Sequence, residues 1–568
     1  MLPNTPFSAS SRARSRTLLV AASALVLVLA GSAAPALAAS GTATDPTSGR
    51  TYYSSKTPYV PQQSPAELQT APAGFLPVYT ESVARHGSRA LSSFKYDSLT
   101  TQIWEQARSE GALTELGTTL GPEVQKLTAA NQKLGYGNLT GQGATQHRGI
   151  GSRVVERLPS LFAGIDAGTD TVAVESSGEA RATASGKAFE QGLEQADPLI
   201  SSHLPAAIVK RPDTLYFHKA DINADYQEYA DSAKVSDAVD AIYAQPRSHD
   251  AAREVLERVY TPAFVDRLAA GAYHFVDGGD GKTTVDNEVD AAMMLYNLYI
   301  IAPDMTEEVQ VDFDRYFAGT DAEWFAYLLD SDDFYGKGPA FAGSDITYKM
   351  ATPLLTDFLD SIDARLAGST TAATFRFAHA ETIIPFAALI GLPGSTQPVT
   401  PDAPYSYATN AWRGETVTPM AANVQWDVYR DASGRAIVRM LYNEQEIAFR
   451  ASCTPIAPGS HFYDVSEVRR CITGQVADIS VTPPRAISDP SLPAAVGTGG
   501  AGTLAATGED ATERDLLIGL ALALLTAGAG AIAVRSARGR RTRLRTASVL
   551  GHDVITFGES RRGGSTLR

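Results

Sequence analysis

The segment that most constrains the fold of this chain is a short run at residues 75–84 (FLPVYTESVA). Its apolar and β-branched residues predict a strand. The run passes directly into Arg85-His86-Gly87-Ser88-Arg89, and a helical pattern follows near residues 97–110. A predicted strand therefore ends at a polar motif, and a predicted helix follows the motif.

The same order of strand, polar exit and helix occurs twice more. Residues 169–176 are a predicted strand, and a predicted helix near 178–193 follows it. Residues 374–378 are another predicted strand, and a predicted helix near 383–392 follows that one. Strands that alternate with helices predict an α/β fold, with a mostly parallel sheet core flanked by helices. In such sheets functional groups gather beyond the carboxyl ends of the strands.

A long helical stretch separates the second and third predicted strands. Residues 220–370 are dominated by helical periodicity, as in DAAMMLYNLYI and KMATPLLTDFLDSI. We therefore expect a mainly helical cap subdomain to be inserted into the α/β core. Residues 140–162 also show a helical pattern.

The motif around His86 suits phosphoryl transfer. A neutral imidazole can attack phosphorus, while guanidinium groups such as those of Arg85 and Arg89 bind the phosphoryl oxygens in pairs. A solvated basic turn is the alternative. The other two strand exits favour the catalytic interpretation, because they add Arg181 and the sequence His379-Ala380-Glu381.

These three motifs resemble those of the histidine acid phosphatases. RHGxR, a mid-chain Ser-Ser…Arg…Ser…Phe…Gly-Leu pattern and a distal HAE occur here in the family's order, and the resemblance covers roughly residues 75–455. Many members carry His-Asp at the distal motif, whereas His-Ala-Glu is the pattern of the multiple inositol polyphosphate phosphatases, or HAE-type phytases. The resemblance implies an α/β core with a helical cap, no metal or other cofactor, and hydrolysis of inositol polyphosphates such as phytate.

The resemblance and the chemistry together assign roles to the motif residues. His86 is the predicted nucleophile, and Glu381 is predicted to protonate the leaving oxygen and later activate water. The residues predicted to hold the phosphoryl group are Arg85, Arg89, Arg181 and His379.

Other polar residues near these motifs have weaker assignments. Lys95 is a candidate contact to a neighbouring phosphate, and an ordinary surface lysine is the alternative. We interpret Ser88 as a turn residue, and His147 and Arg148 as structural. Asn443 and Glu444 match the subgroup without an assigned role.

Two other functions fit the same residues. One is a broad acid phosphatase that acts on sugar phosphates by the same mechanism. The other is a non-catalytic surface protein that binds phosphate ligands on this scaffold. The intact His86, His379 and Glu381 argue against the second, since a binding protein needs no nucleophile.

Charge excludes one class of partner. The net charge is −15, of which residues 1–38 contribute +3 and residues 516–568 contribute +7, so residues 39–515 carry −25. A broad basic face for nucleic acid is therefore not expected. An anionic substrate needs a local basic pocket, and we expect a monomer.

The first 38 residues resemble a removed signal peptide. Arginines 12, 14 and 16 precede an apolar run at 18–30, and Ala36-Leu37-Ala38 supplies the small residues of a cleavage site. A membrane anchor is the alternative, although the run is shorter than the ~20 residues that span a bilayer. Residues 39–74 are interpreted as a leader, and the phosphatase domain is placed at 75–481.

The C-terminal segment is interpreted as an anchor. A spacer at 482–507 leads into Leu504-Ala505-Ala506-Thr507-Gly508, which resembles the sortase signal LPxTG in its LAxTG form. This sorting signal extends over 504–545 and includes an apolar run at 516–534, followed by clustered arginines, and a tail at 546–568 remains. Sortase would join Thr507 to cell-wall peptidoglycan. A plain membrane helix is the alternative, and either places the enzyme outside the cell.

Only two cysteines occur, Cys453 and Cys471. In an exported protein this pair predicts one disulfide that closes a short loop.

Overall fold

The computed structural model describes residues 51–473. The predicted signal peptide, spacer, sorting motif at Thr507 and apolar run at 516–534 lie outside the described residues. Within residues 51–473, no helix combines the length and hydropathy needed to cross a membrane.

The core is a sheet in the order β10-β8-β7-β1-β6-β2-β3, with β9 paired to β8. The strands β1, β6, β2 and β3 pair in parallel, whereas β7, β8, β9 and β10 extend the sheet in antiparallel pairs. The bounds are β1 (Leu76–Arg85), β2 (Thr171–Ser176), β3 (Val209–Lys210), β6 (Thr371–Ala378), β7 (Asn423–Arg430), β8 (Ala436–Tyr442), β9 (Gln445–Ile447) and β10 (Tyr463–Asp464). The predicted α/β fold with parallel core strands and flanking helices is confirmed, and the antiparallel extension is an addition to it.

The three predicted strands that carry motifs lie next to one another. Arg85 of β1 pairs with Ala378 of β6, and Ser176 of β2 pairs with Phe377 of β6. The carboxyl ends of β1, β2 and β6 therefore meet at one edge of the sheet.

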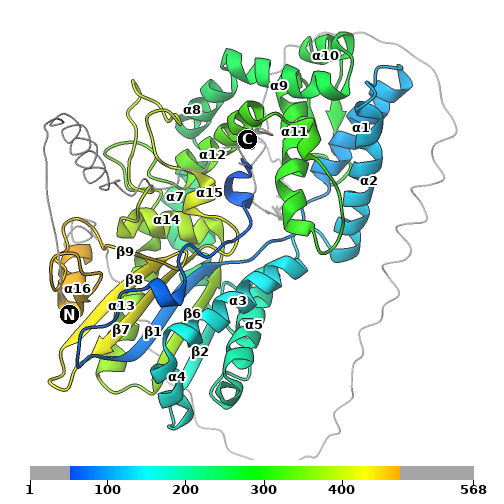
Figure 1. The fold of residues 1–568 in the computed structure, drawn as a ribbon. Coiled ribbons are helices and arrows are strands. Elements are labelled where there is room, and N and C mark those ends of the chain that lie inside the picture. Colours follow the sequence, from blue (N-terminus) through cyan, green and yellow to red (C-terminus); the bar gives the residue numbers. More distant parts are fainter. Residues whose placement is uncertain (1–50, 474–568) are drawn as a thin grey trace, which may run out of the picture. The chain divides into compact units, whose positions relative to one another are not determined.

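Helices cover the sheet on both faces (Figure 1). They are α3 (Gly141–Arg157), α4 (Pro159–Asp166), α5 (Ala180–Ala196), α13 (Thr352–Leu366), α14 (Ala380–Ile390) and α16 (Val465–Thr473). The helical pattern at 140–162 divides into α3 and α4, because Pro159 begins a new helix. α3 and α5 pack closely, since a Cβ on Gly192 would lie 2.1 Å from the Arg148 carbonyl oxygen.

A second group of helices lies beyond the carboxyl ends of the parallel strands (Figure 1). The α1 and α2 helices pack against α9 and α11, although they precede residue 220 in the sequence. The bounds are α1 (Lys95–Ser109), α2 (Gly117–Leu134), α7 (Ala224–Ala230), α8 (Ala233–Tyr243), α9 (Pro246–Val259), α10 (Pro262–Ala269), α11 (Glu288–Ile301) and α12 (Gly319–Gly336), with a hairpin of β4 (Phe275–Val276) and β5 (Thr284–Val285). Nearly every side chain of α11 is buried, so this helix forms the centre of the group.

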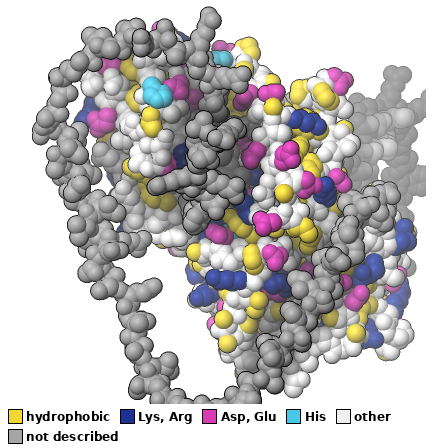
Figure 2. Space-filling model, turned by 180° about the vertical axis from the view of Figure 1, so that it is seen from behind, with side chains coloured by type: hydrophobic (Ala, Val, Ile, Leu, Met, Phe, Trp, Pro, Cys, Tyr) yellow, Lys and Arg dark blue, Asp and Glu magenta, His cyan; other side chains and the backbone are white. Residues whose placement is uncertain are grey.

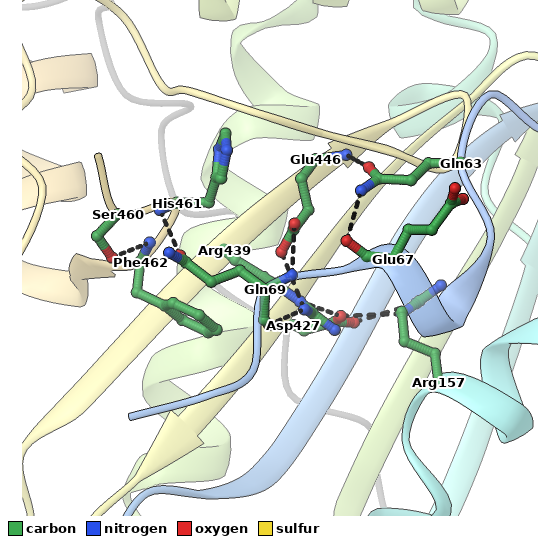
Figure 3. A network of polar contacts seen from close by, with 10 residues as sticks. All are labelled: Gln63, Glu67, Gln69, Arg157, Asp427, Arg439, Glu446, Ser460, His461 and Phe462. Carbon is green, nitrogen blue, oxygen red and sulfur yellow. Dashed lines mark hydrogen bonds and ion pairs between the residues drawn. The ribbon is translucent and has the colours of Figure 1, made fainter. Parts of the chain in front are cut away.

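Residues 51–69 of the expected leader are packed into the fold. Asp427 of β7 accepts hydrogen bonds from Arg157 and Arg439 (Figure 3). Arg439 also donates to the Gln69 carbonyl oxygen at 3.1 Å, and Glu446 accepts from the Gln69 backbone N–H at 2.7 Å. A buried ion-pair network thereby ties the N-terminal segment to the antiparallel half of the sheet.

Acidic and basic side chains are interspersed on the face seen in Figure 2. The visible Lys and Arg side chains form small separate groups there, with Asp and Glu between them. The visible described part of this face therefore shows no broad basic patch of the kind that nucleic acid would need.

The predicted disulfide is present. Cys453 and Cys471 are bonded, with their Cα atoms 5.2 Å apart, and Cys471 lies in α16. In the loop-entropy estimate, a closed loop of this size constrains the unfolded chain by ~3 kcal/mol.

Candidate active site

A cavity of about 460 Å³ opens where β1, β2 and β6 end. The predicted site residues that line it are Arg85, His86, Arg89, Lys95, Arg181 and Glu381. The ring of His379 lies 5.5 Å from the ring of His86, measured between centroids. The fold thus brings together residues that are up to 296 positions apart, from Arg85 to Glu381.

His86 is oriented by the backbone. Its backbone N–H donates to the Ala378 carbonyl oxygen at 2.9 Å, which continues the β1–β6 ladder by one residue. Its Nδ1 lies 2.9 Å from the Gly87 carbonyl oxygen. Because a carbonyl only accepts, Nδ1 must carry the hydrogen, and Nε2 keeps its lone pair.

The surroundings keep the His86 imidazole neutral. Burial lowers the pKa of His86 well below its ordinary value, and the positive charges of Arg181 and Arg85 lower it further. A neutral imidazole with a lone pair at Nε2 is the form that can attack phosphorus.

The turn after His86 is held tightly against α3. A Cβ on Gly87 would lie 2.4 Å from the Gly143 carbonyl oxygen, so only glycine fits here. Ser88 donates to Asp304 at 2.5 Å and accepts from the Gln146 amide at 2.8 Å. Ser88 is therefore placed as a turn residue.

Arg85 and Arg89 supply two buried positive charges. Arg85 donates through Nη1 to the carbonyl oxygens of Ser55 and Thr418, and its Nε has no hydrogen-bond partner among the described residues. Arg89 donates through Nη1 to the Ala90 carbonyl oxygen at 2.7 Å. Burial lowers the pKa of each arginine to about 10, so both remain charged at neutral pH.

Arg181 and His379 form a linked pair. Arg181 donates from Nη2 to Nδ1 of His379 at 3.2 Å, and the Ser177 hydroxyl lies 2.7 Å from Nε2. Because guanidinium can only donate, His379 is neutral with its hydrogen on Nε2, directed at Ser177. Burial lowers the pKa of His379 well below its ordinary value, which agrees with this assignment.

Glu381 lies in the first turn of α14 and is buried. Burial raises the pKa of Glu381, but the opposing effects, led by the positive charge of Lys337, outweigh it and hold the pKa well below the ordinary value. The carboxylate is therefore ionised before substrate binds. A bound phosphate adds negative charge beside it, which favours protonation of Glu381.

Lys95 is the first residue of α1 and lines the outer wall of the cavity, which is formed by the start of α1 and the β4–β5 hairpin. Asp277 and Asp280 of the β4–β5 hairpin line the same cavity. The Asp277 carboxylate accepts backbone hydrogen bonds from Gly279, Gly281 and Thr283, so it holds the hairpin turn. The exposed Asp280 pairs with Lys282.

The two residues predicted to be structural, and the two without an assigned role, have structural contacts. His147 is buried and lies 3.1 Å from the Arg85 carbonyl oxygen, while Arg148 bonds Thr145 on an exposed helix face. Glu444 accepts from Arg153 and from the Tyr59 hydroxyl, and the Asn443 amide oxygen accepts from the Asn423 backbone at 3.0 Å.

Several residues around the site have no counterpart in the sequence predictions. They are Ser55, Lys56, Asp304, Lys337 and Thr418, which contact or electrostatically influence the predicted residues. Ser177 belongs to the predicted Ser-Ser motif, but its contact with His379 was not predicted. The aromatic residues of TYYSSKTPY at 51–59 are the one sequence signal that this segment is packed rather than extended in solvent.

Comparisons with known proteins agree with this geometry. Residues 80–443 match the family model of the histidine phosphatase superfamily (branch 2). The crystal structure of a Bifidobacterium longum multiple inositol polyphosphate phosphatase in complex with inositol hexasulfate is 44% identical. It has a TM-score of 0.71, and the match covers 75% of this chain and 98% of that one.

A second structure of this enzyme and one further relative support the same family assignment. The phosphate complex of the same Bifidobacterium longum enzyme is 43% identical, with a TM-score of 0.72 and the same coverage of both chains. Multiple inositol polyphosphate phosphatase 1 from Gallus gallus is 23% identical over 440 residues, which are 73% of this chain and 89% of that protein.

Proposed function

Because this chain belongs to the histidine phosphatase superfamily (branch 2), and within it to the multiple inositol polyphosphate phosphatases, we propose that it dephosphorylates phytate and related inositol polyphosphates through a phosphohistidine at His86. The chain is a phosphoric monoester hydrolase. The observation that carries the proposal is the neutral imidazole of His86, with Nδ1 bound to Gly87 and Nε2 left as a nucleophile among three arginines.

The first half-reaction transfers the phosphoryl group to the enzyme. Nε2 of His86 attacks phosphorus, the P–O bond to the inositol ring breaks, and the leaving oxygen takes a proton from Glu381. Arg85, Arg89 and Arg181 bind the equatorial oxygens and spread their charge in the transition state. An inositol alkoxide is a poor leaving group, so protonation by a positioned acid contributes ~10²–10⁴-fold.

The second half-reaction releases phosphate. Glu381, now a carboxylate, takes a proton from water, the water oxygen attacks phosphorus, and the P–N bond to His86 breaks. The depressed pKa of Glu381 in the site without substrate suits this step, because the ionised form is the base that is required. The same residue thus acts as acid and then as base.

The substrate class is supported by two observations. The Bifidobacterium longum relative was crystallised with inositol hexasulfate, in which sulfates stand in for phosphates. The cavity of this chain is about 460 Å³ and extends from His86 and its arginines to Lys95, so it has room for a substituted ring.

The test is to incubate the purified protein with phytate and, in parallel, with glucose phosphate, and to identify the products. A kcat/KM for phytate well above that for glucose phosphate supports the proposal. Equal or reversed values favour the broad acid phosphatase, and lack of hydrolysis of either substrate favours the non-catalytic binding protein.

We further propose that the enzyme is exported and attached to the cell wall at Thr507. The proposal depends on residues 1–38 and 504–545 alone. Deletion of residues 504–508 is expected to release the enzyme from the wall fraction or to leave it in the membrane. Unchanged wall attachment would contradict this anchor.

A further inference from the structure

Lys56 lies directly behind the phosphate site, although no step of the mechanism uses it. Its side chain is only 3% exposed. Lys56 shares a small cavity with Arg89, Ser92 and Tyr96, and the first two of these also line the catalytic cavity. Arg89 and Ser92 thus border both the cavity at Lys56 and the substrate cavity.

The N-terminal segment holds Lys56 in this place. Tyr296 of α11 donates to the Tyr52 carbonyl oxygen at 2.6 Å, and the Met420 backbone donates to the Thr57 carbonyl oxygen at 2.9 Å. Ser55, the residue before Lys56, accepts from the guanidinium of Arg85. The segment, blue in Figure 1 where it passes α11 and α15 (Gly414–Val417), is therefore a built part of the site.

The hydrogen bonding of Lys56 is unusual for a buried lysine. Its Nζ donates to the Ser55 hydroxyl at 3.1 Å, and among the described residues no carboxylate forms an ion pair with it. The nearby Asp333 carboxylate pairs with Lys337 instead. Buried lysines without an ion-pair partner readily lose their proton.

Charged and titratable groups face Lys56 from several elements. They are Arg85 at the end of β1, Arg89 in the turn after it, Tyr96 from α1, Asp304 from the turn after α11, Asp333 near the end of α12 and Lys337 just after α12. Burial, and after it the charges of Arg85 and Arg89, lower the pKa of Lys56 well below its ordinary value.

We propose that Lys56 is a positioning residue which takes up a proton from solvent when an anionic phosphate or sulfate group of the ligand binds, and so adds a further positive charge behind Arg85 and Arg89. Before the ligand binds, a further cation here would repel the two arginines. A bound anion reverses this balance, because its negative charge favours the ammonium form. The positive charge of the site therefore increases when the anion binds.

This inference rests on the proposed function. One probe distinguishes a failure of the inference from a failure of the proposed function. Inositol hexasulfate is suitable because its sulfate groups stay fully ionised near neutral pH, so the ligand itself takes up no protons. Failure of the wild-type protein to bind it would count against the proposed function. A difference between variants of Lys56 tests the inference.

The experiment is calorimetric titration of the full protein with inositol hexasulfate in buffers of different ionisation enthalpy, which reports the protons taken up per ligand. The variants are Lys56→Met, which keeps the chain length without the charge, and Lys56→Arg, which keeps a permanent charge. Lys126→Met on the exposed surface of α2 is the matched control.

For Lys56→Met we expect about 10-fold weaker binding, the order of effect of one unit charge in a partly screened site, and a proton uptake lower than that of the wild type. Lys56→Arg should bind like the wild type but with the same reduced uptake, which a purely structural role for Lys56 would not produce. Lys126→Met should match the wild type in both measurements.

Wild-type affinity and wild-type proton uptake in a folded Lys56→Met protein would overturn the proposal. If Lys56→Met does not fold, Lys56→Arg decides, and undiminished proton uptake in that variant would overturn the proposal equally. Absence of proton uptake by the wild type on binding would also contradict it.

Discussion

The inner wall of the catalytic cavity is formed at the ends of β1, β2 and β6, whereas the outer wall is formed by the start of α1 and the β4–β5 hairpin. On the inner wall, His86 and Glu381 are buried, and backbone groups fix the orientation of His86 and Arg85. On the outer wall, Asp280 is exposed and pairs with its neighbour Lys282. The comparison suggests that the sheet fixes the chemistry, while the helical region adjusts which substrates are accepted.

The inner wall predicts the largest single effect. His86→Ala should abolish turnover of every phosphomonoester, because the other imidazole on this wall, that of His379, has both ring nitrogens hydrogen-bonded, to Arg181 and Ser177. The measurement is the initial rate on phytate and on p-nitrophenyl phosphate, with circular dichroism as the control for folding. Substantial activity in a folded variant would show that the nucleophile is another residue.

Glu381→Gln should lower the rate on phytate by ~10²–10⁴-fold, the usual contribution of a positioned acid. Formation of the phosphoenzyme from p-nitrophenyl phosphate should suffer far less, because nitrophenolate leaves without protonation. Stopped-flow absorbance should show a burst of nitrophenol followed by slow turnover. Equal loss of this first step for both substrates would mean that the acid lies elsewhere.

Arg181→Ala should reduce kcat/KM on the order of 10²-fold, since the guanidinium donates to charge that develops in the transition state. Lysine at this position should rescue little, because an ammonium group lacks the paired donors and cannot hold His379 in the same way. Steady-state kinetics with both variants provide the check. Parent-like kinetics for Arg181→Lys would remove Arg181 from the inner wall.

The outer wall should give the smallest and most selective effect. Lys95→Ala is expected to reduce kcat/KM for phytate only a few-fold, as for a screened and partly exposed charge. The value for p-nitrophenyl phosphate should not change, because that substrate carries no second phosphate. An equal loss with both substrates would indicate that Lys95 acts on the scissile phosphate and that the two walls are not separate in function.

The two walls also differ in how well the sequence predicts them. The strand exits that carry His86, Arg181 and Glu381 follow from the alternation of strands and helices, which brings the three carboxyl ends to one edge. The alternation of strands and helices stops after α14, so the antiparallel strands β7 and β8 were not predicted. Each strand of the β4–β5 hairpin has only two residues, which is too short to show the alternation of apolar and polar residues that is typical of a strand.

The N-terminal segment was predicted least well. Its composition of Ser, Thr, Pro and Gln is typical of a leader, yet Tyr52, Tyr53 and Lys56 are buried. Its burial depends on partners more than 200 residues away, such as Tyr296 and Asp330, which local patterns do not contain. The contact of Ser55 with Arg85 could therefore be found only in three dimensions.

The most direct test of this account is to locate the phosphoryl group during turnover. The protein should be mixed rapidly with an excess of phytate, quenched in alkali, where phosphohistidine survives, and digested for mass spectrometry. The account predicts a phosphorylated peptide that contains His86, and its absence from His86→Ala prepared in parallel. Phosphate found on another residue, or turnover without any phosphorylated intermediate in repeated rapid quenches, would contradict it.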